Sequence, residues 1–143
     1  MIRVLFVCTG NTCRSPMAEA ILRKKAGNNV EVKSAGIFAG EGSPASVNTT
    51  QVLEENGIQC QHSSSLLNQD HIEWATCILT MTSQHKQAIL YNFPEARDKL
   101  FTLQEFVDGN GDVSDPYGGS VDIYRETYAE LEPLIEKVLF KLK

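Results

Sequence analysis

An apolar run near the start of the chain leads through a short loop into a helix start. Residues 2–7 (IRVLFV) are mostly apolar, which is typical of a buried strand, and Cys8 follows at once. Ser15 and Pro16 suit the first turn of a helix and Gly27 suits its end, which predicts a helix over residues 15–26. The chain therefore begins with a strand, a short loop and a helix.

The rest of the chain continues this alternation. Three further strands are expected, at residues 30–33, 75–81 and 100–103. A helix with Ser43 as its N-cap and Pro44 at its first helical position should end at Gly57. Another helix, capped by Ser83, should run to about Tyr91.

The last part of the chain consists of a loop and a long helix. Residues 104–119 are rich in Gly and Asp, as loops are. Apolar residues then recur at steps of three and four, which predicts a helix with one face in the core: Tyr124, Tyr128, Leu131, Ile135, Val138 and Leu142. Pro133 falls inside this stripe and is expected to bend or interrupt the helix.

Strands that alternate with helices favour an α/β fold with a parallel sheet covered on both faces. No internal repeat and no linker rich in Pro, Gly or Ser divides the chain, so residues 1–143 are predicted to form a single domain. Ligands of such folds bind beyond the carboxyl ends of the strands, which is where Cys8 lies.

Composition restricts the partners and the compartment. A formal net charge of -5 argues against a nucleic-acid-binding face, and no stretch is long and apolar enough for a membrane span. The N-terminus lacks the long apolar region of a signal peptide, and the 4 cysteines have no disulfide-scaffold spacing. We therefore expect a cytoplasmic protein with reduced thiols. Its overall charge does not attract anions, so local groups must do so.

The loop after the first strand carries groups suited to phosphate chemistry. A thiolate at Cys8 would be the nucleophile, and a helix N-terminus with an adjacent arginine can lower a cysteine pKa to roughly 3.5–7.5. The backbone amides of residues 9–15 would converge on the loop centre, and the helix dipole adds positive potential. Arg14 supplies a planar fork that matches two phosphate oxygens. The alternative is a buried cysteine that ends a strand beside a surface arginine.

Two residues suit the tight path of this loop, and a third suits the chemistry of the sulfur. Gly10 allows a close backbone approach, and Asn11 suits a left-handed loop residue. Ser15 could donate a hydrogen bond to the sulfur of Cys8 and assist its departure in a second step.

A displacement at phosphorus also needs a proton donor for the leaving group. Asp115 is the best-placed candidate, because Pro116 stiffens the chain after it and two glycines let the loop approach the site. The alternative is that Asp115 only starts a turn. No metal ion or other cofactor is expected, because the three histidines lack the spacing of zinc ligands.

Residues 7–16 (VCTGNTCRSP) and 115–117 (DPY) together resemble the low-molecular-weight protein tyrosine phosphatase family, and the resemblance covers essentially the whole chain. It implies a four-stranded parallel sheet of order 2-1-3-4 flanked by helices, with the phosphate-binding loop after the first strand. It also implies that Cys8 is the nucleophile, Arg14 the phosphate clamp and Asp115 the general acid and then base.

The resemblance extends to supporting residues. The positions that match its hydrogen-bond network behind the loop are Asn11, Ser15, Ser34 and His62. Phe38 and Tyr117 match the walls of the substrate cleft. Thr9, Gly10, Thr12 and Cys13 complete the phosphate-binding loop.

Thr12 distinguishes this chain from typical family members, which carry an aliphatic β-branched residue there. Threonine resembles the bacterial protein-arginine phosphatase branch, as do residues 81–86, 101–103 and 115–120. A hydroxyl at this position could orient a guanidinium that isoleucine would exclude, although Thr12 could also be an indifferent loop residue. Thr12, Phe38 and Tyr117 are therefore the expected selectivity residues.

The leading hypothesis is a protein-arginine phosphatase that hydrolyses phosphoarginine through a phosphocysteine intermediate. Its partners would be phosphorylated proteins, and a monomer is expected. A tyrosine phosphatase with the same machinery is the closest alternative. An arsenate reductase would need a closely spaced redox pair, whereas Cys60 and Cys77 are far apart in sequence. A non-catalytic phosphate-binding module would need neither a thiolate nor a movable acid.

Cys13 adds a redox hypothesis. It lies in the same loop as Cys8 and could capture oxidised Cys8 as a disulfide, which would protect Cys8 from irreversible oxidation. The alternative is a small buried residue that only fits its space.

Overall fold

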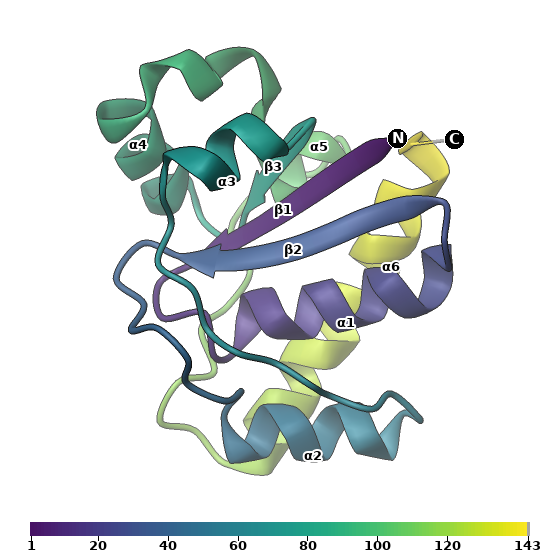
Figure 1. Ribbon diagram of the computed structural model, residues 1–143. Coiled ribbons are helices and arrows are strands. Elements are labelled where there is room, and N and C mark those ends of the chain that lie inside the picture. The colour runs from purple at the N-terminus through teal and green to yellow at the C-terminus, as the bar shows by residue number, and fades with distance from the viewer. Residues whose placement is uncertain (143) are drawn as a thin grey trace.

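The computed structural model describes residues 1–142 and contains a four-stranded parallel sheet of order β2-β1-β3-β4 (Figure 1). The elements in chain order are β1 (Ile2–Cys8), α1 (Arg14–Ala26), β2 (Val30–Gly36), α2 (Val47–Glu55), α3 (Gln69–Trp74), β3 (Cys77–Thr80), α4 (Ser83–Asn92), the 3-10 helix η1 (Pro94–Lys99), β4 (Leu100–Thr102), α5 (Leu103–Phe106) and α6 (Val121–Leu142). The expected α/β class and strand order are confirmed.

Strand β1 lies between β2 and β3, which places its last residue at the centre of the carboxyl edge of the sheet. Its register with β2 runs from Ile2 opposite Val30 to Cys8 opposite Gly36. The carbonyl oxygen of Cys8 accepts a hydrogen bond from the backbone N–H of Ile37 at 3.0 Å. The loop that follows β1 is thus anchored to the end of β2 at its first residue.

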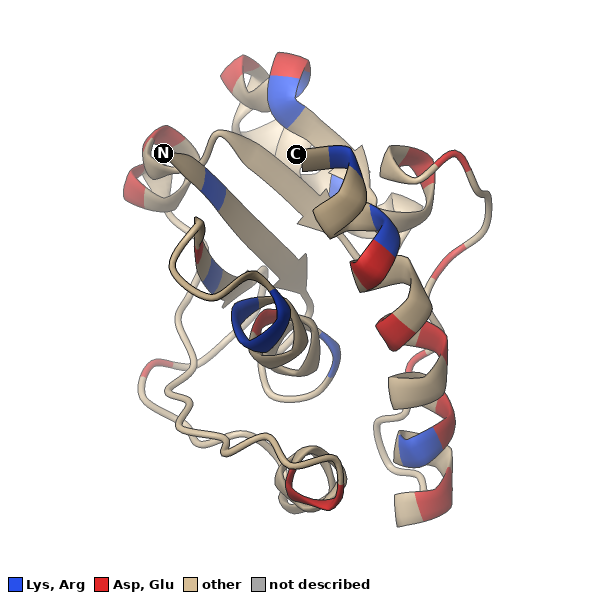
Figure 2. Cartoon of the chain, turned by 90° about the vertical axis from the view of Figure 1, so that its right-hand side faces the viewer, with Lys and Arg blue, Asp and Glu red and all other residues tan. Residues whose placement is uncertain are grey.

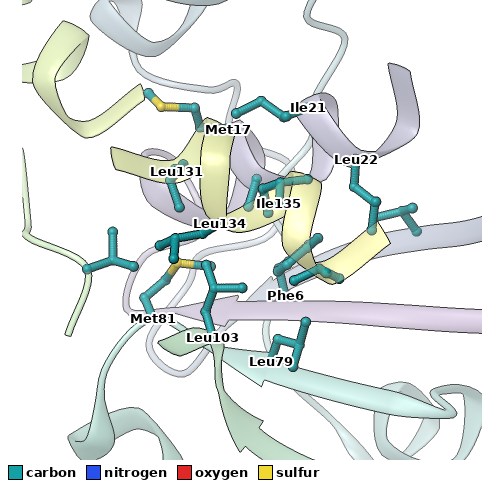
Figure 3. Packing of buried hydrophobic residues seen from close by; sticks show 14 of the residues in the cluster. Phe6, Met17, Ile21, Leu22, Leu79, Met81, Leu103, Leu131, Leu134 and Ile135 are labelled. Atoms are coloured by element: carbon teal, nitrogen blue, oxygen red, sulfur yellow. The ribbon is translucent and has the colours of Figure 1, made fainter. Parts of the chain in front are cut away.

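Helices cover both faces of the sheet, with α1 and α6 on one face and α3 and α4 on the other (Figure 1). Alternate residues of β1 enter the two cores, because successive side chains of a strand point to opposite faces. Phe6 packs with α1 and α6, whereas Leu5 and Val7 pack with α3 and α4. Figure 3 shows the first core, in which Phe6 and Leu79 of the sheet face Ile135 of α6.

The exposed face of α6 carries both acidic and basic residues (Figure 2). Among them, Arg125 pairs with Asp122 within the helix and with Glu55 of α2 at 2.7 Å. This contact ties α6 to the C-terminal end of α2. No helix in residues 1–142 is long and apolar enough to cross a membrane.

The start of α2 corrects the sequence-based expectation. The helix begins at Val47, and Ser46 is its N-cap, whose side chain accepts from the N–H of Thr49 at 3.2 Å. Ser43 instead exchanges hydrogen bonds with Ser64, donating its N–H to the hydroxyl at 2.9 Å. This pairing holds the residues before Ser46 outside the helix, so the prediction that Ser43 caps it was wrong.

Other helices also differ from expectation. The cap of α4 is Thr82 rather than Ser83. The helix α5 lies partly within the segment assigned to a loop, because Thr102 and Glu105 form a capping box at its start. Helix α6 is not interrupted at Pro133. Its buried residues lie on both sides of the proline, and their packing against the core holds the helix together despite the missing hydrogen bond.

Candidate active site

The loop between β1 and α1 surrounds a small cavity at the carboxyl edge of the sheet. The cavity has a volume of about 220 Å³. Its lining consists of loop residues and two residues of the distant segment before α6: Cys8, Thr9, Gly10, Thr12, Cys13, Arg14, Asp115 and Tyr117. The structure therefore brings together the three residues expected to carry the chemistry.

Cys8 is buried, and its sulfur lies beside a serine hydroxyl. Its Sγ lies 2.8 Å from the hydroxyl of Ser15. Because that hydroxyl accepts a hydrogen bond from Asn11 Nδ2 at 2.8 Å, its own proton is free to be donated to the sulfur.

The pKa of the Cys8 thiol is raised in the structure, whereas the sequence led us to expect a low value. Burial raises the pKa of the thiol above its ordinary value. Hydrogen bonds from Ser15 and from the loop backbone, and the charge of Arg14, oppose this effect by lowering the pKa. Burial is the largest of these effects, so the opposing groups must stabilise the thiolate against the cost of desolvation.

Asn11 is the centre of the hydrogen-bond network behind the loop. Its φ of 58° places it in the left-handed region, which asparagine tolerates better than most residues. Its Nδ2 also donates to Ser34 at 2.9 Å, and its Oδ1 accepts from the N–H of Ser65 at 2.9 Å. One side chain thus joins the loop, α1, β2 and the segment before α3.

His62 contacts the backbone of the loop at Asn11. Its Nε2 donates to the backbone carbonyl of Asn11 at 2.7 Å, and its Nδ1 lies 3.8 Å from Glu19 Oε1. Glu19 also accepts a hydrogen bond from Ser34. Ser34 and His62, both inferred from the resemblance, therefore lie in one network with Asn11.

Arg14 is buried and links the loop to the Asp115 segment. Its Nη1 donates to the carbonyl of Val113 at 3.0 Å, and its Nη2 lies 3.6 Å from Asp115 Oδ2. The Asp115 side chain is 56% exposed, and its Oδ1 accepts from the N–H of Tyr117 at 3.0 Å. Asp115 therefore both starts a turn and reaches the cavity.

The three residues expected to set selectivity lie in different environments. Thr12 lines the cavity, and its carbonyl accepts hydrogen bonds from Ser46 at 2.9 Å and from Thr49 at 3.2 Å. Tyr117 lines the cavity at its exposed rim. Phe38 is 82% exposed and does not contribute to the lining.

Cys13 points into the protein on the side of α6. Its Sγ lies 3.3 Å from the hydroxyl of Tyr124, whose pKa is raised to about 12, mainly by burial. The sequence pattern predicts Tyr124 only as an apolar core residue of the last helix. Its polar contact depends on a tertiary packing that no local pattern reveals.

His85 is a second residue of the site whose role no sequence pattern predicts. Its Nε2 lies 2.9 Å from the hydroxyl of Thr9, on the wall of the cavity. Within residues 1–142, no group of three or more His, Cys, Asp or Glu side chains is arranged to hold a metal ion.

Known proteins resemble this chain over nearly its full length. Residues 3–143 match the family model described as low molecular weight phosphotyrosine protein phosphatase. A protein-arginine-phosphatase of Geobacillus stearothermophilus is 57% identical over 142 residues, which are 99% of this chain and 96% of that protein.

Solved structures of similar proteins have the same fold as this chain. The YwlE arginine phosphatase from Geobacillus stearothermophilus superposes with a TM-score of 0.97 at 56% identity, over 99% of this chain and 93% of that one. A cysteine-to-serine mutant of the YwlE arginine phosphatase with a phosphorylated active site serine has a TM-score of 0.94 at 46% identity, over 99% of this chain and 95% of that one. The chain therefore belongs to the low molecular weight phosphotyrosine protein phosphatase family, which confirms the resemblance inferred from its two motifs.

Proposed function

We propose that this chain is a protein-arginine phosphatase that hydrolyses phosphoarginine through a phosphocysteine intermediate. The observation that carries the proposal is the convergence of Cys8, Arg14 and Asp115 on one cavity. The names of the relatives, which are arginine phosphatases, support the substrate.

In the first step, the Cys8 thiolate attacks phosphorus and the bond from phosphorus to the guanidine nitrogen breaks. The loop amides and Arg14 stabilise the charge on the three equatorial oxygens. Asp115, in its protonated form, gives its proton to the departing nitrogen. The products are a free arginine side chain and a phosphocysteine.

In the second step, water attacks the phosphocysteine and Asp115 accepts the proton of that water. The bond from sulfur to phosphorus breaks, inorganic phosphate leaves, and the Ser15 hydroxyl stabilises the sulfur that regains its electron pair. Replacing Asp115 with asparagine should lower kcat roughly 10²- to 10⁴-fold, the usual contribution of a positioned acid. A wild-type rate in Asp115→Asn would contradict this assignment.

A Cys8→Ser variant distinguishes an enzyme from a phosphate-binding module. The hydroxyl is a far weaker nucleophile than the thiolate, so turnover should be abolished while the protein remains folded. Equal performance of Cys8→Ser and wild type in every assay would favour a binding module.

Thr12 lines the cavity, and we propose that its hydroxyl helps to select phosphoarginine over phosphotyrosine. The deciding measurement is kcat/KM for free phosphoarginine and phosphotyrosine, with wild type and Thr12→Ile. We expect a strong preference for phosphoarginine that the substitution reverses. Preference for phosphotyrosine in both proteins would assign the chain to tyrosine phosphatase activity, the second candidate, which the description of the family favours.

We further propose that Cys13 protects Cys8 under oxidation. Peroxide would convert the Cys8 thiol to a sulfenic acid, and attack by Cys13 would form a disulfide and release water. Cys13 would first have to leave its contact with Tyr124. Faster irreversible inactivation of Cys13→Ala by peroxide would support this role, and unchanged recovery with a thiol reductant would contradict it.

The setting that we propose is a monomer in the cytoplasm that acts on phosphorylated proteins and needs no cofactor. All four cysteines are free thiols in the structure, which supports a reducing compartment. Fractionation of cells and sedimentation of the purified protein test the two statements separately.

A further inference from the structure

A buried histidine supports the wall of the cavity. His85 lies in α4 and is only 7% exposed. The N-cap of this helix, Thr82, accepts a hydrogen bond from the backbone N–H of His85 at 3.1 Å, which fixes the backbone of His85 in the first turn of α4. From there its Nε2 reaches Oγ1 of Thr9, the residue that follows Cys8.

The surroundings of His85 determine which ring nitrogen carries the proton. Burial and the nearby Arg14 lower the pKa of His85 to about 4, so the ring is neutral near pH 7 and holds one proton. Its Nδ1 is buried and has no hydrogen-bond partner within residues 1–142. A proton there would be a buried donor without an acceptor, which folded proteins rarely tolerate. A proton on Nε2 has an acceptor in Thr9.

The position of this proton decides what Thr9 offers to a ligand. A hydroxyl has one proton, and when Oγ1 accepts from His85 that proton stays available to the cavity. Phosphoryl oxygens in front of Cys8 are acceptors and would take it. In the opposite tautomer the hydroxyl would donate to the ring, and only its lone pairs would face the negatively charged oxygens.

We propose that His85 is a positioning residue that fixes the Thr9 hydroxyl as a hydrogen-bond donor to the phosphoryl group of the substrate. The assignment rests on the proposed phosphatase function, and it adds a side-chain donor to the loop amides and Arg14. A hydrogen bond to a charged group has a strength that corresponds to a loss of roughly 10- to 100-fold in kcat/KM when the donor is removed.

Variants of Thr9 test the hydroxyl directly, because this residue is exposed. We expect Thr9→Val to lower kcat/KM for phosphoarginine roughly 10- to 100-fold and to weaken competitive inhibition by inorganic phosphate. Thr9→Ser keeps the hydroxyl and should restore both values to within a few-fold. Thr76→Val, which removes an exposed threonine hydroxyl at the opposite end of the sheet, is the matched control. Wild-type behaviour of Thr9→Val would overturn the proposal.

Variants of His85 test whether it acts through Thr9. Asparagine is too short to reach the hydroxyl, so His85→Asn should lower kcat/KM in the wild-type background but cause no further loss in Thr9→Val. The longer amide of His85→Gln can donate from the position of Nε2 and should recover part of the activity. His71→Asn, which affects only the cap of α3, is the control. Equal losses in both backgrounds would indicate a merely structural histidine and overturn the proposal.

The tautomer can be observed without any turnover. Long-range ¹H–¹⁵N NMR spectra of the wild-type protein distinguish the two neutral forms of histidine, and we expect the Nε2–H form of His85. The Nδ1–H form would overturn the proposal even if every variant of His85 failed to fold. If the wild-type enzyme hydrolysed neither phosphoarginine nor phosphotyrosine, the proposed function would fail, whereas the tautomer and the phosphate affinity would still decide the role of Thr9 and His85.

Discussion

Replacing Gly36 with alanine tests how closely the loop after β1 is held against β2. A Cβ at Gly36 would lie 2.5 Å from the carbonyl oxygen of Thr9 and 2.9 Å from the backbone nitrogen of Asn11. Ordinary contacts begin near 3.4 Å, so the loop must move by up to about 0.9 Å to make room. Both atoms belong to the backbone and cannot rotate away, so the movement must involve the loop itself.

A displacement of this size beside Cys8 should lower kcat/KM roughly 100-fold, because a misplacement of about 1 Å can have that effect on catalysis. The crowding should also lower the free energy of unfolding by about 1–3 kcal/mol. The assays are phosphoarginine hydrolysis and urea unfolding. Gly40→Ala is the matched control, since within residues 1–142 no heavy atom outside Gly40 and its two chain neighbours lies within 4 Å of a Cβ at that position. Wild-type kcat/KM in Gly36→Ala would refute the reasoning.

Three further predictions concern the support of the loop. Ser15→Ala removes the donor 2.8 Å from the sulfur, so the pKa of Cys8 should rise and alkylation by iodoacetamide should move to higher pH; an unchanged profile would contradict this. Asn11→Ala removes three side-chain hydrogen bonds and should lower the free energy of unfolding by about 2–3 kcal/mol, as measured with urea. The pKa of His85 falls from 6.5 to about 4 on folding, so the unfolded chain binds the proton first as the pH drops. The free energy of unfolding should therefore fall by up to about 3 kcal/mol between pH 6.5 and 4, and His85→Gln should lack this loss.

The sequence predicted the centre of the site well because that centre is local. The nucleophile, the loop amides and the arginine lie within a few residues of one another, between a strand and a helix start. Once β1 and α1 form, their geometry leaves the loop little freedom. Asp115 was found by a different signal, an acid before a proline in a glycine-rich loop. Its distance of 3.6 Å from Arg14 depends on the fold.

The outer support of the loop could not be derived from local patterns. Ser46 became the cap of α2 because Ser43 pairs with Ser64, a residue of a distant irregular segment. Thr9 contacts His85, which lies 76 residues away in the sequence, and Cys13 contacts Tyr124, which lies 111 residues away. Such contacts arise when the sheet brings separate connections to the same edge, and hydrophobic periodicity carries no information about them.

The resulting site combines a fixed loop with an exposed acid. Segments on several sides hold the loop backbone, since Ile37 binds the carbonyl of Cys8, His62 that of Asn11 and Ser46 that of Thr12. The backbone amides of the loop are therefore held in place before the substrate arrives. They need no reorganisation when charge develops on the phosphoryl group. Asp115, in contrast, is 56% exposed, with freedom to follow first the leaving nitrogen and then the attacking water. Changes to the loop supports should therefore lower activity and stability together. Asp115→Asn should lower kcat with little effect on the free energy of unfolding, because the ion pair that it removes is long, at 3.6 Å, and its carboxylate is exposed to solvent, so that its contribution is about 0–1 kcal/mol.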